Sequence, residues 1–274
     1  MSIQLIPYKP AGTIGSGPYV LREYKPDTGV DISALSITYT GAHTDYGMVT
    51  MSDGARYRLL AFTASGTLSM EQPVNCEVCV VGGGANGTNG RSGGGVGGAG
   101  AYLKNQAVSA YNGGSVVVGA GQGVSSIADV SVNAVSGKNG GTGAGGTTAG
   151  TGDGISKYPF EDTGYSLWAG KPHCAGGGQG VEKNVEKGFT GGDGGTNGSN
   201  GYPRHNDIVS SPSGGAGGSY GGGVGGSHAS YNGGNATYYG SGAGGGGHRY
   251  PAGYYGGSGY QGIVYIRIPE EQAA

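Results

Sequence analysis

Few side chains in this 274-residue sequence stand at a spacing that supports catalysis. Glu161 and Asp162 adjoin aromatic residues, and two carboxyl groups that flank a sugar can act as general acid and base. Neighbouring carboxylates in a sequence are more often solvated loop charges. The five histidines are scattered, and none has a serine or cysteine nearby in a nucleophile context. We therefore expect no catalytic residues and a protein that is not an enzyme.

Two motifs are typical of bound metals and nucleotides, but their surroundings argue against both. Cys76 and Cys79 are spaced as half of a zinc site, yet they lie in an alternating β-pattern that turns residues three apart to opposite faces. No second cysteine pair or His-x3-His motif follows, so we expect no metal. Residues 80–87 fit the glycine pattern of a dinucleotide site, but the glycine-rich chain that follows cannot form the required helix. We expect no cofactor.

Glycine is the most informative residue, because 68 are present and many recur with a period of three. Three residues per turn is the period of polyproline-II geometry, and a helix with glycine along one edge lets another backbone approach and supply hydrogen bonds. The sequence therefore predicts a bundle, or sandwich, of short polyglycine-II helices. The four rows are Gly84, Gly87, Gly90 and Gly93; Gly137, Gly140, Gly143 and Gly146; Gly192, Gly195, Gly198 and Gly201; and Gly253, Gly256, Gly259 and Gly262.

Short runs of β-forming residues frame the glycine rows, so the expected fold is mostly β or irregular. We expect three parts: an N-terminal attachment module at residues 1–55, a glycine-rich domain at 56–269 and a tail at 270–274. The expected strands cover residues 32–39, 48–51, 57–63, 74–81, 115–119, 127–135 and 262–268.

Chemically varied segments connect the expected helices and hold most of the aromatic side chains. Tyr, Ser, Gly and Asn are also typical of antibody contact loops, where tyrosine offers a large contact area at low entropic cost. Tyr220 and Tyr260 lie inside glycine-rich rows and are expected to cover the helices. The expected contact residues are Tyr158, Trp168, Tyr202, His205, Tyr231, Tyr238, Tyr239, His248, Tyr250, Tyr254 and Tyr255.

Three segments and the glycine rows between them resemble the glycine-rich domains of bacteriophage tail fibres. The order is also similar to that of the receptor-binding adhesins at the long tail fibre tips of T-even-like phages, over residues 57–269. The segments are Phe62-Thr63-Ala64-Ser65-Gly66-Thr67-Leu68, Val78-Cys79-Val80-Val81-Gly82-Gly83-Gly84 and Gly262-Ile263-Val264-Tyr265-Ile266-Arg267.

The resemblance implies a virion protein at the tail fibre tip that attaches the phage to its host. Its tyrosine-rich loops would bind an outer-membrane protein or a surface glycan, and residues 1–55 would dock on a tail-fibre or baseplate protein. Two alternatives stay open. One is a structural glycine-rich virion or wall protein that self-associates. The other is a glycan-cleaving tail protein, which would need Glu161, Asp162 or Asp207.

The net charge and the hydropathy of the sequence argue against nucleic acids and membranes as partners. The net charge is -2 and no strongly basic block is present, so we expect no nucleic-acid partner. No stretch is apolar for long enough to span a membrane, so we expect no membrane insertion. Residues 1–7 lack the basic end and apolar run of a signal peptide, which favours synthesis in the host cytoplasm.

Overall fold

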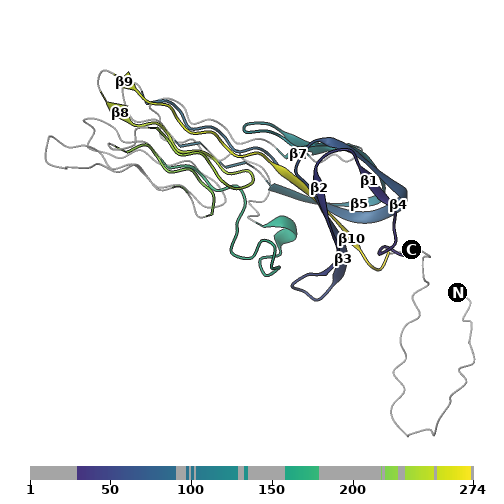
Figure 1. Cartoon of the computed structure of the whole chain (residues 1–274). Helices are drawn as coiled ribbons and strands as arrows, with labels where there is room; N and C mark the ends of the chain where they lie inside the picture. The colour runs from purple at the N-terminus through teal and green to yellow at the C-terminus, as the bar shows by residue number, and fades with distance from the viewer. Residues whose placement is uncertain are drawn as a thin grey trace, which may run out of the picture.

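The computed structural model describes residues 30–90, 97–98, 100–101, 103–128, 133–134, 158–178, 217, 220–227, 232–249 and 252–272. Most of this part of the chain is β-structure or irregular, and its only helix is a 3-10 turn, η1 (Pro159–Glu161). The mostly β class expected from the sequence is therefore confirmed. Figure 1 shows the strands gathered at one end, with glycine-rich segments extending away from them.

The strands form one antiparallel sheet in the order β2-β3-β10-β4-β5-β6-β7, and β1 also pairs with β4. The final strand, β10, lies between β3 and β4, so the C-terminal part of the chain completes the centre of the sheet. The strands are β1 (Ile37–Tyr39), β2 (His43–Thr50), β3 (Arg56–Phe62), β4 (Gly66–Val81), β5 (Leu103–Val117), β6 (Ser125–Ile127), β7 (Asn133–Ala134) and β10 (Ile263–Pro269). A separate hairpin joins β8 (His248–Arg249) to β9 (Ala252–Gly253).

Each face of the sheet packs against its own apolar core, because side chains alternate along a strand. Leu60 and Phe62 lie in one core with residues from β1, β4 and β10. Leu59 and Ala61 lie in the other core, where Phe160 and Trp168 cover the sheet. Cys76 belongs to the first core and Cys79 to the second, so the two thiols face opposite sides and cannot bind one metal ion together.

Several strand boundaries differ from the expected ones. β2 and β4 begin at His43 and Gly66, earlier than the expected strands at 48–51 and 74–81, and the expected strand at 127–135 is replaced in its described part by the end of β6 and by β7. β5 begins at Leu103, well before the expected strand at 115–119, because a neighbouring strand supplies ladder hydrogen bonds even to a polar sequence. The early residues of the expected strand at 32–39 form a turn instead. The Asp31 carboxylate accepts a hydrogen bond from Ser33 N–H at 3.0 Å, which favours a turn over an extended strand.

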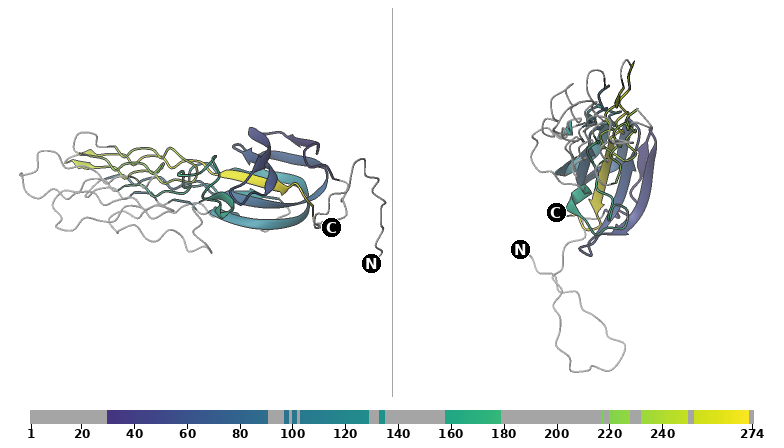
Figure 2. Two further views of the ribbon diagram at one scale, coloured as in Figure 1. Left: turned by 90° about the horizontal axis from the view of Figure 1, so that it is seen from below. Right: turned by 90° about the vertical axis from the view of Figure 1, so that its left-hand side faces the viewer.

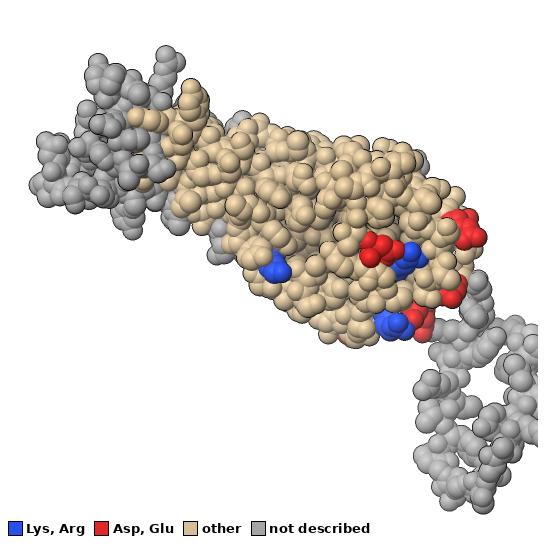
Figure 3. All heavy atoms as spheres, viewed as in Figure 1, with Lys and Arg blue, Asp and Glu red and all other residues tan. Residues whose placement is uncertain are grey.

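Charged side chains gather over the sheet. On the face drawn in Figure 3, most blue and red atoms lie toward the end that carries the strands. The described glycine-rich segments 83–90, 220–227, 232–247 and 254–262 contain no Asp, Glu, Lys or Arg. Among the described residues, these glycine-rich segments therefore offer a partner uncharged side chains, in contrast to the sheet.

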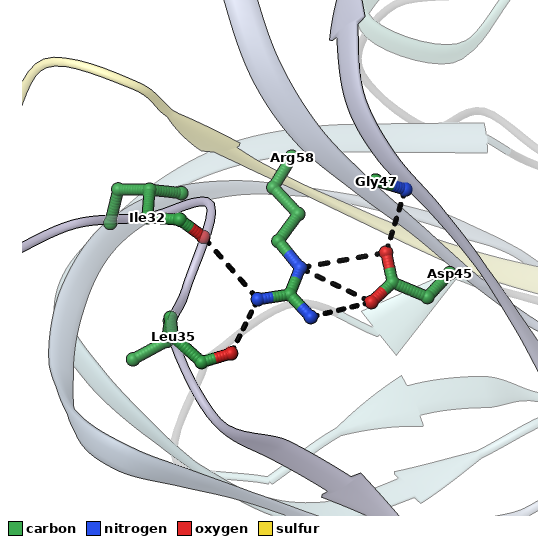
Figure 4. A network of polar contacts seen from close by, with 5 residues as sticks. All are labelled: Ile32, Leu35, Asp45, Gly47 and Arg58. Carbon is green, nitrogen blue, oxygen red and sulfur yellow. Dashed lines mark hydrogen bonds and ion pairs between the residues drawn. The ribbon is translucent and has the colours of Figure 1, made fainter.

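Arg58 ties the first described residues to the sheet (Figure 4). Its guanidinium donates to the carbonyl groups of Ile32 and Leu35 and forms an ion pair with Asp45, at 2.6 Å between Nη2 and Oδ2. Asp45 lies at a bulge of β2, where Gly47 has a φ of 65° and donates its N–H to Oδ1 at 2.8 Å. Residues 30–55 are thus integrated into the sheet, and the expected boundary at residue 55 falls between the paired strands β2 and β3. Residues 1–29 lie outside the described residues.

Candidate functional site

The glycine-rich segments run side by side away from the sheet, and both views in Figure 2 show this arrangement along the long axis and end-on. We call segments 83–90, 97–101, 174–178, 220–227, 232–236, 240–247 and 254–262, without residue 99, the glycine body. Its segments are joined by backbone hydrogen bonds between residues far apart in the sequence. The hairpin of β8 and β9 lies at the end of this body that is far from the sheet (Figure 1).

Segment 240–247 is the centre of the glycine body, and its backbone groups bind its neighbours with a period of three residues. Its N–H groups donate to segments 174–178, 83–90 and 232–236 in turn. These bonds run from Gly242 to Ala175 (2.7 Å), Ala243 to Ala85 (3.0 Å), Gly244 to Gly234 (2.9 Å), Gly245 to Gly178 (2.9 Å) and Gly246 to Thr88 (2.9 Å). Its carbonyl groups accept hydrogen bonds from N–H groups of segments 220–227, 97–101 and 254–262. The donors are Gly223 to the carbonyl of Gly242 (3.0 Å), Gly98 to Ala243 (2.6 Å), Gly257 to Gly244 (2.8 Å) and Gly226 to Gly245 (2.8 Å).

The first glycine row predicted from the sequence lies against this central segment. A Cβ atom added at Gly84, Gly87 or Gly90 would overlap carbonyl groups of segment 240–247. The fourth row meets the first, because a Cβ atom at Gly256 or Gly259 would overlap segment 83–90. Only glycine permits backbones to approach this closely. The rows at 137–146 and 192–201, and Gly93 of the first row, lie outside the described residues.

Two pairs of asparagines complete the hydrogen bonding of segment 254–262, and the sequence analysis missed them. Each Oδ1 accepts from a backbone N–H, and the two residues of a pair are three apart. The bonds are Gly259 to Asn86 (2.8 Å), Gly256 to Asn89 (3.0 Å), Tyr255 to Asn232 (3.1 Å) and Ser258 to Asn235 (2.9 Å). The Asn-x-x-Asn spacing at 86–89 and 232–235, in phase with the glycine rows, was the available signal.

Aromatic rings form a continuous chain from the second core to the surface, where the glycine body meets the sheet. Trp168 contacts Tyr265, with ring centroids 5.5 Å apart, and Tyr265 contacts His173 at 5.8 Å. His173 contacts Tyr238 at 4.9 Å and Tyr239 at 6.2 Å. The chain ends at Tyr220, 4.7 Å from Tyr238, and at Tyr260, 5.6 Å from Tyr239.

Burial determines the ionisation of this chain of rings. Burial lowers the pKa of His173 to about 3, with the backbone of Lys171 partly opposing it, so the imidazole is neutral near pH 7. Its Nε2 lies 3.2 Å from the Tyr265 hydroxyl. Burial also raises the pKa of Tyr238, Tyr239 and Tyr265, so these phenols remain protonated. The rings therefore offer uncharged hydroxyl groups that can donate or accept hydrogen bonds.

The structure describes the side chains of six of the eleven expected contact residues. Tyr255 is the most exposed, with 70% of its surface accessible, whereas Tyr158, Tyr238, Tyr239 and Tyr254 are half-buried. Trp168 needs a correction: it is fully buried, donates from Nε1 to Asp162 O at 2.5 Å and has no surface left for a receptor. For His248 the structure places only the backbone, in β8. Tyr202, His205, Tyr231 and Tyr250 lie outside the described residues.

Glu161 and Asp162, the carboxylates considered for glycan cleavage, differ in their surroundings. Glu161 is exposed. Asp162 accepts backbone hydrogen bonds from Ser52, Gly164 and Tyr165, each at 3.0 Å, and so organises a loop. Burial raises its pKa, but a hydrogen bond from the Ser52 side chain and these backbone hydrogen bonds together lower it more, so the net pKa lies below the ordinary value. A general acid requires the opposite shift. Asp207 lies outside the described residues.

No protein-family model matches this chain, and no match is found among curated proteins. Among the described residues, no helix has the length and apolarity needed to cross a membrane. In the same residues, no three His, Cys, Asp or Glu side chains lie close enough together to hold a metal ion.

Proposed function

We propose that this protein is a tail-fibre tip adhesin that attaches a bacteriophage to a receptor on the bacterial surface. The observation that carries the proposal is the hydrogen-bonded glycine body, which extends from the sheet (Figure 1) and bears the exposed aromatic side chains of Tyr220, Tyr255 and Tyr260. A rigid scaffold that displays variable aromatic segments is suited to recognition. The resemblance of residues 57–269 to phage adhesins supports the same function.

The segments of the glycine body are, in this proposal, polyglycine-II helices packed as a bundle. A helix with three residues per turn directs successive backbone groups to three sides, and the repeat returns to the same neighbour every third residue. Gly242 and Gly245 both donate to segment 174–178, while Ala243 and Gly246 both donate to segment 83–90. This periodicity agrees with that geometry and differs from the two-residue alternation of a strand.

The proposed orientation follows from where the described chain ends. Residues 32 and 35 pack in the first core, and Gln272 accepts a hydrogen bond from Asn75 N–H at 2.7 Å, so both described ends lie on the sheet. We place the attachment to a fibre or baseplate protein at this end, through residues 1–55. The opposite end, with the β8–β9 hairpin, Tyr254 and Tyr255, would contact the receptor, an outer-membrane protein or a surface glycan.

Binding of fluorescently labelled protein to a panel of intact Gram-negative bacteria tests the proposal. We expect saturable binding to a subset of strains, and competition with adsorption of a phage that carries the protein. Tyr255→Ser is expected to weaken binding and leave the melting temperature unchanged, since this ring is mostly exposed. A folded protein that binds no strain and instead self-associates in sedimentation experiments would favour a structural virion protein.

A further inference from the structure

Segment 254–262 of the glycine body turns three sides toward different surroundings. Its backbone hydrogen bonds to segment 83–90 recur at every third residue, so residues three apart share a side. A Cβ atom at Gly256 would overlap segment 83–90, whereas one at Gly257 would overlap the backbone of Gly234. At these glycines, two of the three sides therefore pack against neighbouring backbone.

The third side of segment 254–262 carries exposed side chains. Tyr255 is 70% exposed, and Ser258, which lies three residues further along, is exposed as well. Asparagine amides border these residues, because each amide oxygen accepts a hydrogen bond from the backbone of the segment, and three of these asparagines are exposed. We call the surface they form the amide row, which consists of Tyr255, Ser258, Asn89, Asn232 and Asn235.

The backbone hydrogen bonds fix the orientation of each amide. A backbone N–H can bond only to the oxygen of an amide group, so the nitrogen keeps both of its N–H donors. Within the described part of the chain, Asn89, Asn232 and Asn235 make no hydrogen bond through Nδ2. Groups that are held in place before a ligand arrives lose less entropy on binding it. The amide row therefore presents preorganised hydrogen-bond donors at the surface.

The donors of the amide row repeat along its length. Asn232 and Asn235 are three residues apart, which corresponds to about 9 Å in polyglycine-II geometry. A linear polysaccharide likewise repeats its oxygen atoms at a regular interval along its axis, and its sugar rings have apolar faces that can pack on an aromatic ring. Such a chain could accept hydrogen bonds from successive amides while one of its sugars packs on Tyr255.

The described residues around the amide row supply donors and no charge. Segments 83–90, 232–247 and 254–262 contain no Asp, Glu, Lys or Arg. The nearest charged residues along the chain are Arg91, which lies outside the described residues, and Arg249, of which the structure places only the backbone, in β8. Recognition by the row itself therefore depends on hydrogen bonds and ring packing.

A protein receptor fits the amide row less well than a glycan does. Protein interfaces are centred on clusters of large side chains that become fully buried. The row has one such side chain, Tyr255, beside hydroxyl and amide groups.

We propose that the amide row binds a linear glycan, whose hydroxyl groups accept hydrogen bonds from the asparagine amides while one sugar ring packs on Tyr255. The inference rests on the proposed function, in which the target lies on a bacterial surface, and it names the class of receptor.

Binding of the full-length protein to linear polysaccharides of glucose, galactose or mannose tests the site, measured by affinity electrophoresis at several salt concentrations. A polyuronate is the charged comparison. We expect one of the neutral polymers to bind, with little dependence on salt. A preference for the polyuronate, or a steep dependence on salt, would show that charged residues carry the binding and would overturn the site.

Asn→Asp substitutions separate the donors from the fold. Asn89→Asp and Asn235→Asp keep the oxygen that accepts from the backbone but lose the amide N–H groups, so each should weaken binding about tenfold and leave the melting temperature unchanged. Tyr255→Ala should weaken binding to a similar degree, and it decides the test if an Asp variant unfolds early. Asn112→Asp makes the same chemical change at an exposed asparagine of β5 and should bind normally.

The outcomes separate this site from the adhesin function. No binding of any polysaccharide, or binding unchanged in Asn89→Asp, Asn235→Asp and Tyr255→Ala, would overturn the site. If the Asp variants still bind bacterial cells normally, the adhesin proposal stands without it, and loss of cell binding after protease treatment of the cells would identify a protein receptor instead. Polysaccharide binding by a protein that binds no cells would retain the site and remove the adhesin function.

Discussion

The backbone N–H of Gly259 donates to the side-chain oxygen of Asn86 across 2.8 Å, and Gly256 makes the same bond to Asn89. Among the described residues, backbone hydrogen bonds also join segment 254–262 to segments 83–90, 232–236 and 240–247. The asparagine amides add side-chain acceptors to this backbone network.

Removal of one of these amides should loosen segment 254–262 locally. Asn89→Ala and Asn235→Ala leave Gly256 and Ser258 without their acceptors, and each exposed bond contributes about 1 kcal/mol. We expect faster amide hydrogen exchange at Gly256 in the first variant and at Ser258 in the second. Asn→Asp substitutions retain the acceptor oxygen and serve as controls. Uniformly faster exchange throughout the glycine body would contradict this local role.

Alanine substitution of two hydrogen-bonded glycines should give very different losses of stability. A Cβ atom at Gly244 would overlap the backbone of Val224, whereas at Gly234 its nearest neighbour is Val224 N at 3.1 Å. We expect Gly244→Ala to destabilise the protein by several kcal/mol, on the order of 3 or more, and Gly234→Ala by about 1. Urea unfolding measures both. Equal losses would mean that the segments separate easily enough to admit a methyl group.

The stability of the protein should fall on acidification because of His173. Its pKa is lowered to about 3 by burial, against about 6.5 in an unfolded chain. The unfolded state therefore binds the extra proton between these values. The stabilisation is complete above pH 6.5 and is lost as the pH falls toward 3, by at most about 1.4 kcal/mol per pH unit. NMR titration checks the cause directly, since an imidazole that titrates near pH 6.5 in the folded protein would refute it.

Arg58→Lys should destabilise the protein more than Arg56→Lys. Arg58 is mostly buried and bonds the carboxylate of Asp45 and two carbonyl groups, a set that an ammonium group cannot satisfy in the same geometry. We expect a loss of about 2 kcal/mol in the free energy of unfolding. Arg56 pairs with Glu270 in solvent, so its variant should lose less than about 1 kcal/mol. A similar loss in both variants would show that residues 32–35 do not depend on Arg58.

The three cysteines should be unreactive toward thiol reagents until the protein unfolds. Burial raises the pKa of Cys76 to about 12, with Glu77 adding to the effect, and burial also raises the pKa of Cys79 and Cys174. Because the thiolate is the reactive form, modification near pH 8 should proceed at the rate of unfolding. Rapid modification of the native protein would indicate local opening of a core.

The three-residue period of glycine was enough to identify Gly84, Gly87, Gly90, Gly256 and Gly259 as places where backbones meet, because only glycine leaves room for such contacts. The β-forming residues of 57–63, 74–81 and 262–268 were likewise enough to find the central strands. Local sequence carries both signals, since each follows from the repeat of the backbone itself.

Only the tertiary structure decided which segments become neighbours. Segment 240–247 is central because residues far away in the chain supply its partners, and nothing in its own sequence distinguishes it from other glycine runs. The same holds for the aromatic residues. Trp168 is buried because the sheet provides a hydrophobic face beside Tyr265, whereas Tyr46, at the bulge of β2, remains 40% exposed. The period of the sequence determines which face of a segment can pack closely. Long-range contacts determine which segment it packs against, and therefore which side chains remain exposed to bind a partner.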